Sequence, residues 1–391
     1  MTSQEETQRL KQQVQAEVER LAPDLLAVSR FLHTNPELAY EERQAAELFT
    51  DILEQHGFAV TRGAASLPTA FTGQIGSGGP RIAFLAEYDA LPGLGHGCGH
   101  NTMAASGVGA AIALAEVRDA FAGEIVFLGT PAEERGSGKG IMIAEGAFEG
   151  LDAALLYHPC DRSHVASEAL ASEDVEVVFN GLQSHASSDP WKGKNALDAM
   201  IALFVAVGLW RQQLPPHARV HGIISEGGTA ANIIPDRTKA WFMIRSADQV
   251  HYEVMRTRFR ALAEAAALAA DCGVEVTFSA GSMTMNTNRT LAELWVANAA
   301  AHGVVDQGPD PFAGSTDMGN VSWVVPTIHP DLAIADEPTP GHSTAFRNAA
   351  ASPRGDETTL MAATLVAETA VDLLADPSLV ARAWADFRGE G

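Results

Sequence analysis

The chain has 391 residues, more than one ordinary hydrophobic core holds, so its length predicts two domains. Apolar residues make up 46% of the sequence, which is typical of a globular protein, and the formal net charge is −23. Such a negative surface repels nucleic acids and anionic membranes, so neither is expected as a partner, and beyond that the charge indicates mainly solubility.

Cysteine content and the first residues indicate a compartment. The three cysteines, Cys98, Cys160 and Cys272, are too few and too scattered for a disulfide framework. The first 21 residues are polar and helix-prone, without the apolar core of a signal peptide. The apolar stretch at 196–210 is too short to span a bilayer and predicts a buried helix. We therefore expect a soluble cytoplasmic protein.

The first half of the chain predicts alternating strands and helices. Residues 4–57 predict two amphipathic helices separated by a turn at HTNPEL. A buried strand and loop follow at 81–93, and a helix rich in small residues follows at 99–117. Further strands, each followed by a loop, are predicted within 123–140 and 152–159. This alternation is typical of an α/β layer with a mostly parallel central sheet.

The pattern changes near residue 172. From there the predicted order is strand, helix, strand, strand, helix, strand, which is the ferredoxin-like βαββαβ unit. We expect this unit to occupy 172–282 as a compact insertion. The segments 1–171 and 283–391 then form one discontinuous domain, and the second of them is expected to contribute helices and loops.

Polar side chains follow three of the predicted strands at the point where each strand ends. Glu87 and Asp89 follow the first, Glu133 and Glu134 follow the second, and His158 follows the third. In open α/β sheets, ligands bind just beyond the carboxyl ends of the strands. The three groups are therefore expected to converge in one crevice.

The stretch GLGHGCGHN at 93–101 joins the first of these strands to a helix. Side chains two apart on an extended segment point the same way, so Cys98 and His100 can face one metal ion while the glycines let the backbone bend. A glycine-rich turn with a bystander cysteine, or a cysteine nucleophile with a histidine base, explains the same residues. His96 is interpreted as a residue behind the ligands.

Adjacent carboxylates suit metal-assisted hydrolysis. The side chains of Glu133 and Glu134 diverge, so one can bind a metal while the other handles the proton of an attacking water. Cys160, two residues after His158, is expected to be a bystander. His342 lies on a Gly/Pro loop far along the chain, and spacing alone does not distinguish it from His302 or His329 as a further ligand.

Taken together, these motifs resemble metallopeptidase family 20, the aminoacylase and carboxypeptidase G group. The resemblance covers nearly the whole chain and lies within subfamily D, closest to the aminoacylase-1-like protein 2 and p-aminobenzoyl-glutamate hydrolase branch. It rests on the stretches FLHTNPELAYEE, AEYDALPGLGHGCGHN, GTPAEERGSGKG, YHP, GLQSHASSDPWKGKNALDA, SEGGTAANIIPDRTKAWFMIRS, GSTDMGNVSWVVPTIHP and GHS. It implies a zinc-peptidase-like catalytic domain with an inserted lid and dimerisation domain.

The resemblance implies two divalent ions, zinc or manganese, with Cys98 as the bridging ligand where most of the wider family has aspartate. Glu133 becomes the general base, and Asp89 keeps the place of the family's orienting aspartate. Glu87 stands where the wider family has a histidine ligand and is not expected to be one. The implied metal ligands are Cys98, His100, Glu134, His158 and His342.

The resemblance also suggests roles within the insertion. His185 matches the histidine that reaches into the neighbouring subunit's site and stabilises the oxyanion. Asn232 and Arg245 become candidates to hold the substrate carboxylate, although Arg245 can equally pair with an acid inside the lid. Asn101 replaces the aspartate that is usual in the subfamily's CGHD motif, so its role is open.

The expected function is that of a dinuclear metal-dependent amidohydrolase or peptidase, active as a homodimer. Its substrate is an N-acyl amino acid or a dipeptide-like compound, attacked by a metal-activated water. The sequence does not fix the acyl group or the amino acid. Two alternatives stay open: a cysteine amidase that uses Cys98, and a catalytically silent homologue that binds a metal or ligand.

Overall fold

The computed structural model describes residues 3–166, 168–308 and 314–390, which divide into two compact units. Unit 2 comprises Ala169–Thr284 with Gly314–Thr316, and unit 1 comprises the rest of the chain. This division lies beside the expected boundaries at 172 and 282. Each unit has its own hydrophobic core.

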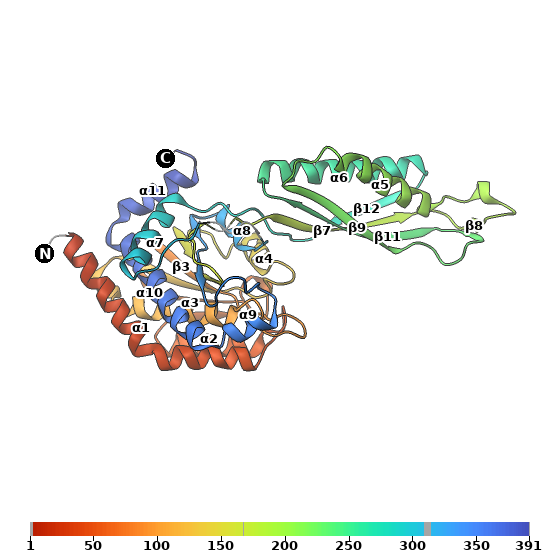
Figure 1. The fold of residues 1–391 in the computed structure, drawn as a ribbon. Coiled ribbons are helices and arrows are strands. Elements are labelled where there is room, and N and C mark those ends of the chain that lie inside the picture. Colours follow the sequence, from red (N-terminus) through yellow and green to blue (C-terminus); the bar gives the residue numbers. More distant parts are fainter. Residues whose placement is uncertain (1–2, 167, 309–313, 391) are drawn as a thin grey trace. The chain divides into compact units, whose positions relative to one another are not determined.

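Unit 1 is built on a six-stranded sheet with the strand order β1-β2-β4-β3-β5-β13. Figure 1 labels β3 among the helices of this unit. Strands β4, β3, β5 and β13 pair in parallel, whereas β1 and β2 join one edge antiparallel. A separate two-stranded parallel pair, β6 with β14, brings residues 158–160 beside 331–333. The strands are β1 Ala59–Arg62, β2 Phe71–Ser77, β3 Arg81–Ala86, β4 Gly123–Gly129, β5 Ala153–Leu155, β6 His158–Cys160, β13 Thr327–Ile328 and β14 Asp331–Ala333.

A fully buried helix, α3 (His100–Ala115), lies at the centre of unit 1 and packs on β3 and β4 as well as on α1 and α10. Its small residues allow this close packing, because a Cβ added at Gly107 would lie 2.5 Å from the carbonyl oxygen of Leu85. The remaining helices of unit 1 are α1 Ser3–Thr34, α2 Arg43–Gln55, α4 Gly138–Ala144, α7 Arg289–Ala301, α8 Met318–Ser322, α9 Thr344–Ala349, α10 Pro353–Ala375 and α11 Pro377–Phe387, with 3₁₀ turns at η1 Ala64–Ser66 and η2 Arg118–Ala120.

One helix of the described residues, α10, is long and apolar enough by composition to cross a membrane. Within unit 1, however, 72% of its apolar window is buried, and it packs against α1, α3 and α7. Its apolar composition is therefore that of a core helix.

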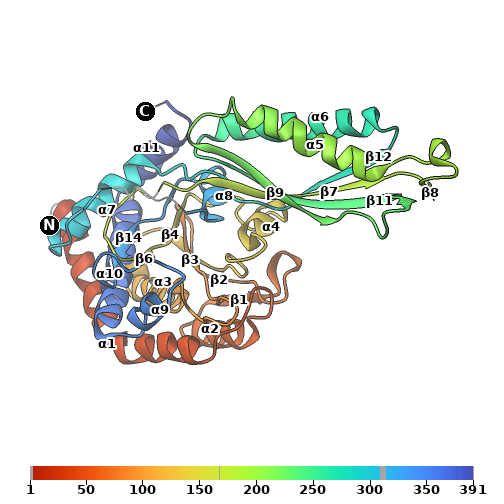
Figure 2. The same ribbon diagram turned by 45° about the vertical axis from the view of Figure 1, so that its right-hand side comes forward.

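Unit 2 is an antiparallel four-stranded sheet, in the order β12-β7-β11-β9, with the helices α5 and α6 along one face (Figure 2). The chain order β7, α5, β9, β11, α6, β12 is the predicted βαββαβ arrangement. The elements are β7 Ala171–Asn180, α5 Ala196–Arg211, β9 Ala218–Glu226, β11 Arg237–Ser246, α6 Gln249–Ala269 and β12 Gly273–Phe278.

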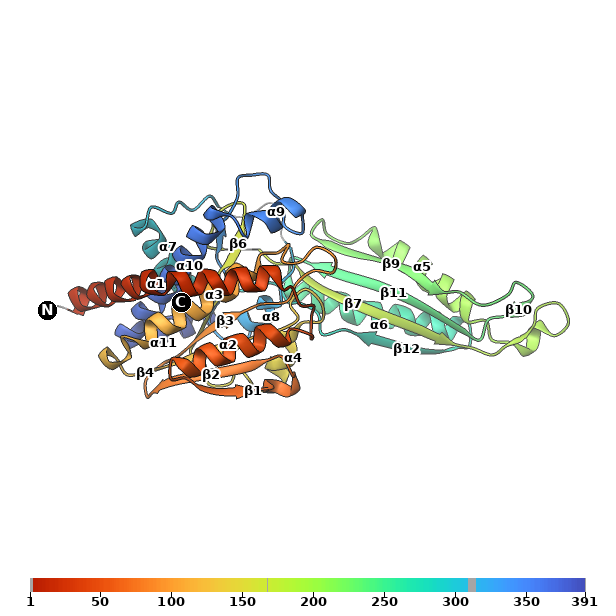
Figure 3. The ribbon, with the colours of Figure 1, turned by 90° about the horizontal axis from the view of Figure 1, so that it is seen from below.

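A short arm extends from one end of the unit 2 sheet (Figure 3). It contains β8 (Ser184–His185), which pairs antiparallel with β10 (Ile233–Ile234), and the 3₁₀ turn η3 (Pro190–Lys192). The backbone N–H of Ala186 donates to the carbonyl oxygen of Asn232, 3.0 Å away, so His185 and Asn232 lie close together on this arm.

The α/β fold with its mostly parallel central sheet agrees with the sequence prediction, but the edges of the sheet do not. Strands β1 and β2 were not predicted, and segment 283–391 was expected to hold only helices and loops, yet it supplies β13 and β14. These strands are short or carry several small and polar residues, so hydrophobic periodicity does not mark them.

Candidate active site

The polar groups that follow β3, β4 and β5 converge within unit 1, as predicted for the carboxyl ends of neighbouring parallel strands. The Nε2 atom of His100 lies 3.4 Å from Glu87 Oε2, 3.9 Å from Glu133 Oε2 and 4.0 Å from Glu134 Oε1. The side chains of all four residues are buried or nearly so.

The glycines of the 93–101 loop let it turn beside β6. Gly99 has a φ of +80°, and a Cβ there would lie 2.6 Å from Cγ of Pro159, so a side chain would force the two segments apart. With the loop in this position, Cys98 Sγ lies 3.4 Å from Nε2 of His158. The backbone N–H of His342 donates to the carbonyl oxygen of Gly97, 2.9 Å away, which holds the distant 339–346 loop at the same place.

The five proposed ligands form two groups that share one thiol. The donor atoms of Cys98, His100 and His158 all lie within 4.8 Å of one another, and so do those of Cys98, Glu134 and His342. If each group held one divalent ion, the Cys98 thiolate that belongs to both groups would bridge the two ions. The set of sulfur, imidazole and carboxylate donors suits first-row divalent metals.

Several polar atoms in and beside these groups make no hydrogen bond with any residue that the structure describes. They are Nε2 of His100, Oε1 of Glu134 and Oε2 of Glu87, each buried from solvent. A buried polar atom without a partner carries a free-energy penalty of about 1–3 kcal/mol. Metal coordination would satisfy the atoms of His100 and Glu134, so the residues present fit the implied ions.

Asp89 orients two of the proposed ligands. Its carboxylate oxygen Oδ1 and its backbone oxygen lie 3.1 and 2.9 Å from Nδ1 of His100, and its Oδ2 accepts the backbone N–H of Glu134 at 3.0 Å. A proton on Nδ1 that is donated to these oxygens leaves Nε2 with its lone pair toward the cluster. This geometry fits the orienting role proposed for Asp89.

A second orienting carboxylate, Asp331, was not found from the sequence. It lies opposite His158 in the β6–β14 pairing, and its Oδ1 is 3.5 Å from Nδ1 of His158. Its Oδ2 is 2.8 Å from Nε2 of His164. Asp331 stands 173 positions beyond His158 in the chain, so only the strand pairing reveals that the two are neighbours.

Glu133 and Glu134 lie on a strained loop. Ala132 and Ser137, on either side of them, have φ values of +61° and +54°, and His342 has +58°. Side chains other than glycine rarely adopt this left-handed region, and such strain is frequent at functional sites. The N–H of Ala132 donates to the buried carboxylate of Glu42 at 2.9 Å, which helps to hold the loop in place.

A buried ammonium group lies behind the cluster. Lys139 Nζ donates to Glu87 Oε1 at 2.6 Å and to Asp317 Oδ1 at 2.5 Å, and none of the Lys139 side chain is exposed. One oxygen of Glu87 is therefore engaged by a lysine, whereas its Oε2 faces His100 and forms a third group of close donor atoms with His100 and Glu133, so Glu87 stays a candidate ligand that the sequence did not predict. Neither Lys139 nor Asp317 was singled out in the sequence.

Burial and neighbouring charges shift the pKa values of this cluster. Burial, reinforced by the carboxylates of Glu87 and Glu134, raises the pKa of Glu133 well above its usual value. Burial alone would also raise the pKa of the Cys98 thiol, but the imidazoles of His158 and His100 together outweigh it and lower that pKa to about 5. Glu133 is thus suited to hold a proton, and Cys98 to carry negative charge as a ligand.

The structure separates His342 from the two other histidines considered with it. His342 Nε2 lies 3.4 Å from Glu134 Oε1, whereas Nε2 of His302 lies 3.0 Å from Oε1 of Glu368 on α10. His329 is buried beside His158, with its Nδ1 3.1 Å from the carbonyl oxygen of Leu156. Among the three, His342 is the one grouped with Cys98 and Glu134.

Three further residues have no place in either ligand group. His96 is buried, which lowers its pKa to about 3, and its ring makes no hydrogen bond within the described chain. Burial raises the pKa of Cys160 to about 11, and its sulfur lies 3.7 Å from Oδ1 of Asp161. Asn101 donates to Ser29 Oγ and to the carbonyl oxygen of Ala350, so this side chain joins helices.

The remaining candidates lie in unit 2. His185 is exposed, and its Nδ1 accepts the backbone N–H groups of Ser187 and Ser188 at 3.2 and 3.3 Å. This arrangement places the ring proton on Nε2, which makes His185 a donor toward its surroundings. Asn232 lies beside it, whereas Arg245 lies near the far end of β11, where its Nε is 3.0 Å from Sδ of Met243. The unit therefore does not bring Arg245 to the other two.

A cavity of about 480 Å³ in unit 1 opens on the candidate metal cluster. Cys98 and His158 line it, with Pro159, Phe346 and the ion pair Arg162–Glu337 on its other walls. Its position next to two proposed ligands makes it the candidate pocket for part of a substrate.

Comparisons with known proteins agree with this geometry. Residues 83–343 match the model of peptidase family M20/M25/M40. The chain is 36% identical to the Xaa-Arg dipeptidase of Mus musculus, over 98% of this chain and 93% of that protein. It is 33% identical to one of the subunits of the p-aminobenzoyl-glutamate hydrolase of Escherichia coli, over 70% of this chain and 63% of that protein.

Solved structures share the fold. A dinuclear metal-binding peptidase of the M20 family from Bacillus subtilis is 21% identical with a TM-score of 0.68, and the match covers 91% of this chain and 99% of that one. The aminobenzoyl-glutamate utilization protein of Klebsiella pneumoniae is 20% identical with a TM-score of 0.72, covering 93% and 98%. These structures show the shared fold, and the family match with the sequence relatives shows that the chain belongs to peptidase family M20/M25/M40.

Proposed function

We propose that this protein is a metal-dependent amidohydrolase that cleaves a dipeptide or an N-acyl amino acid with Glu133 as its general base. The observation that carries the proposal is the pair of ligand groups sharing Cys98, with the Glu133 carboxylate 3.9 Å from Nε2 of His100. Two divalent ions bound by these groups would polarise the scissile carbonyl and acidify the attacking water.

Glu133 carries the proton between the two halves of the reaction. Its carboxylate accepts a proton from the water as the oxygen attacks the amide carbon, and the resulting carboxylic acid later donates that proton to the leaving amine nitrogen. Burial and the neighbouring carboxylates raise the pKa of Glu133 in the metal-free protein, and bound divalent ions would lower it again toward the range in which the carboxylate accepts and returns a proton. Asp89 and Asp331 hold His100 and His158 in place meanwhile.

The family relatives guide the choice of substrate. We propose a dipeptide or N-acyl amino acid small enough for the 480 Å³ cavity beside Cys98 and His158. Dipeptides with a C-terminal arginine or lysine are the first to test, since two relatives are Xaa-Arg dipeptidases and this chain carries a net charge of −23. N-acyl-glutamates form the competing class.

We propose a homodimer formed through unit 2. Helix α5 buries one face against its own sheet, but its opposite face leaves Ile201, Val205 and Leu209 exposed to 50%, 57% and 69%. These residues recur every four positions and form one apolar stripe. Strand β9 lies at the edge of its sheet, so a second copy can continue the sheet while the stripes meet across a two-fold axis.

The positions of the unit 2 candidates support a site shared between copies. Arg245 follows Arg237 by eight residues along β11, about 26 Å at the ordinary rise of a strand. His185 and Asn232 lie beyond the Arg237 end, so one copy cannot present all three to a small substrate. We propose that His185 and Asn232 act in the partner's site, where Nε2–H of His185 donates to the oxyanion.

We propose zinc as the metal and the cytoplasm as the compartment, both from the chemistry of the cysteines. The Cys98 thiolate favours zinc, while the imidazole and carboxylate ligands also accept manganese, so zinc is the first ion to test. All three cysteines are free thiols, which agrees with a reducing cytoplasm as the proposed location.

Glu133→Gln tests the proposal most directly. The variant keeps a side chain of the same shape but cannot accept the proton, so zinc content is expected to stay unchanged while kcat falls by about a thousandfold or more. Metal content and turnover would be measured on the same preparation. Normal turnover would eliminate Glu133 as the base.

Chelation separates the metal enzyme from a cysteine amidase. EDTA is expected to abolish activity, and added zinc or manganese to restore it, because hydrolysis depends on the ions. Activity that survives EDTA and disappears on thiol alkylation would instead identify Cys98 as a nucleophile.

A further inference from the structure

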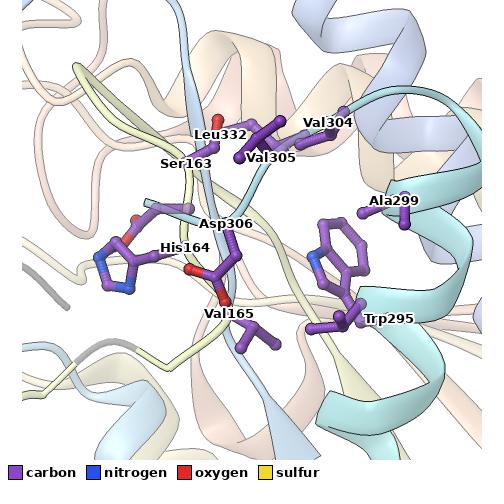
Figure 4. Close-up of a pocket in the computed structure, with 12 residues that line it drawn as sticks. Ser163, His164, Val165, Trp295, Ala299, Val304, Val305, Asp306 and Leu332 are labelled. Carbon is purple, nitrogen blue, oxygen red and sulfur yellow. The ribbon is translucent and has the colours of Figure 1, made fainter. Parts of the chain in front are cut away.

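A second cavity in unit 1 lies on the other side of Asp331 from the candidate metal cluster. It has a volume of about 270 Å³ and lies between helix α7, strand β14 and the segment that follows β6 (Figure 4). All its lining residues belong to unit 1. A space of this size accommodates a molecule somewhat larger than a benzene ring.

The walls of this cavity are mainly apolar. Helix α7 contributes Trp295 and, one turn later, Ala299, while Val304 and Leu332 complete the apolar wall. Trp295, Ala299 and Leu332 are each at least 94% buried, so this wall belongs to the packed body of unit 1. Figure 4 shows the indole of Trp295 on one side of the cavity and His164 on the other.

The polar part of the lining is anionic. Asp306 and Asp331 contribute carboxylates, and the only basic group among the lining residues is the imidazole of His164, which already contacts Asp331. No lysine or arginine lines the cavity among the residues that the structure describes. In Figure 4 the carboxylate of Asp306 lies between His164 and Trp295. An aromatic face beside a carboxylate attracts organic cations, because both the ring quadrupole and the charge favour them.

The side chain of Asp331 contacts both a residue that lines this cavity and a proposed metal ligand. Asp331 Oδ2 lies 2.8 Å from Nε2 of His164, which lines the cavity, and its Oδ1 lies 3.5 Å from Nδ1 of His158, a proposed ligand. Nε2 of His158 in turn lies 3.4 Å from Cys98 Sγ. The backbones of His164 and Asp331 are also bonded to each other in both directions, so this contact is rigid.

We propose that this cavity is a second binding site, for a small organic cation with an apolar body, and that its occupancy weakens metal binding through Asp331 and His158. The coupling rests on the proposed metal centre, but the binding site does not. A positive charge beside Asp331 attracts the carboxylate that orients His158, and it also repels the divalent ions. The bound cation therefore lowers the affinity for metal, and bound metal lowers the affinity for the cation by the same factor.

Binding is tested on metal-free protein by calorimetric titration with phenyltrimethylammonium, which has no lone pair to bind a metal. We expect it to bind at least about tenfold more tightly than the neutral 2-phenyl-2-propanol, and benzenesulfonate not to bind detectably. Ala299→Trp fills the cavity and is expected to abolish binding. Ala297→Trp is the matched control, because Ala297 is exposed on the same helix outside the cavity and should leave binding unchanged.

A separate variant tests whether the cavity prefers cations to neutral molecules. Asp306 is exposed and its carboxylate also accepts the backbone N–H of Gly308, so Asp306→Asn is expected to weaken phenyltrimethylammonium binding by about threefold while leaving the neutral alcohol unaffected. Equal binding of cation, alcohol and anion, or binding that survives Ala299→Trp, would overturn the proposed site.

The coupling is tested by measuring zinc affinity with a competing chelator. Saturating phenyltrimethylammonium is expected to lower zinc affinity by about threefold or more, and this effect should disappear in Ala299→Trp. Unchanged zinc affinity in the wild type would overturn the coupling. If the protein instead binds no zinc at all, the proposed metal function fails, and the result of the metal-free titration still decides the cavity.

Discussion

Asp331 contacts a proposed metal ligand but belongs to neither ligand group itself. Its carboxylate is placed to accept the Nδ1 proton of His158, as Asp89 does for His100. We expect Asp331→Asn to lower zinc affinity by about 10–100-fold, since such orienting carboxylates fix both the tautomer and the ring position of their histidine. A competition titration with a chromogenic chelator measures this.

The matched control for that prediction is Asp336→Asn. Asp336 follows Asp331 closely in the chain, but its side chain is 95% exposed in an ion pair with Arg354. The substitution is expected to leave zinc affinity unchanged. Equal affinity of the Asp331→Asn variant and the wild type would show that His158 needs no orienting carboxylate.

Most of the proposed metal ligands could be predicted from the sequence, but the buried side chains that contact and orient them could not. Cys98, His100, Glu134 and His158 could be predicted because three strands end in polar clusters. His342 came from the resemblance alone, since spacing does not separate it from His302 or His329. Lys139, Asp317 and Asp331 were missed because their partners lie far away in the chain and no local pattern marks them.

Helix α3 depends on close approach to the central sheet. Gly107→Ala would place a Cβ 2.5 Å from the backbone oxygen of Leu85, which cannot move without disturbing β3. We expect this substitution to lower the free energy of unfolding by about 1–3 kcal/mol, despite the better helix propensity of alanine. Chemical denaturation monitored by circular dichroism measures the loss.

Gly109→Ala serves as the comparison on the same helix. Its Cβ would meet side-chain atoms of Leu25, the nearest at 2.6 Å, and no backbone atom, so a shift of one side chain relieves the contact. The gain in helix propensity, about 1 kcal/mol, then offsets the repacking, so little net change is expected. A Gly107→Ala variant as stable as Gly109→Ala would contradict the proposed packing.

Strand β7 and helix α6 are joined by a buried carboxylate whose titration affects stability. Glu173 accepts hydrogen bonds from Tyr252 and Arg256 at 2.7 Å each, yet burial outweighs them and raises its pKa above the usual value of 4.5. Between these two pKa values the folded state binds more protons than the unfolded state. Stability contributed by Glu173 is therefore lost as the pH rises from about 4.5 through the folded pKa.

Glu173→Gln removes this titration. The stability of the wild type relative to the variant is expected to fall as the pH is raised from 4.5 to 7.5 in a series of urea unfolding curves. Glu176→Gln, on the same strand but exposed, shows the effect of losing a surface carboxylate. A relative stability that rises with pH would mean that the ion pair with Arg256, and not burial, dominates.

Helices and strands with a strong hydrophobic periodicity were predicted correctly, whereas the edge strands of the unit 1 sheet were not. The two amphipathic helices at the start of the chain and the βαββαβ order of unit 2 follow from the spacing of apolar residues. Strands β1 and β2 are partly exposed and rich in Gly, Thr and Ser, so their pairing with the central sheet decides their conformation. Strand β14 exists through its pairing with β6, which no sequence pattern specifies.

The proposed homodimer makes a prediction about two inactive variants. If His185 acts in the partner's site, Glu133→Gln removes the base from its own site while still supplying His185 to its neighbour. His185→Ala has the opposite defect. Its own site keeps Glu133, but it supplies no oxyanion donor to its partner, and kcat is expected to fall by about a hundredfold or more. A dimer with one copy of each then contains one complete site and one site lacking both groups.

Mixing the two variants after partial denaturation and refolding is therefore expected to restore activity to about a quarter of the wild type, because half of the dimers are mixed and each has one working site of two. The control mixture pairs Glu133→Gln with the double variant Glu133→Gln/His185→Ala, in which every site lacks the base, so no recovery is expected. Val205→Asp within the α5 stripe should abolish the recovery by preventing association, as size-exclusion chromatography with light scattering would show. Recovery that fails although mixed dimers form would place His185 in its own subunit's site or outside the reaction.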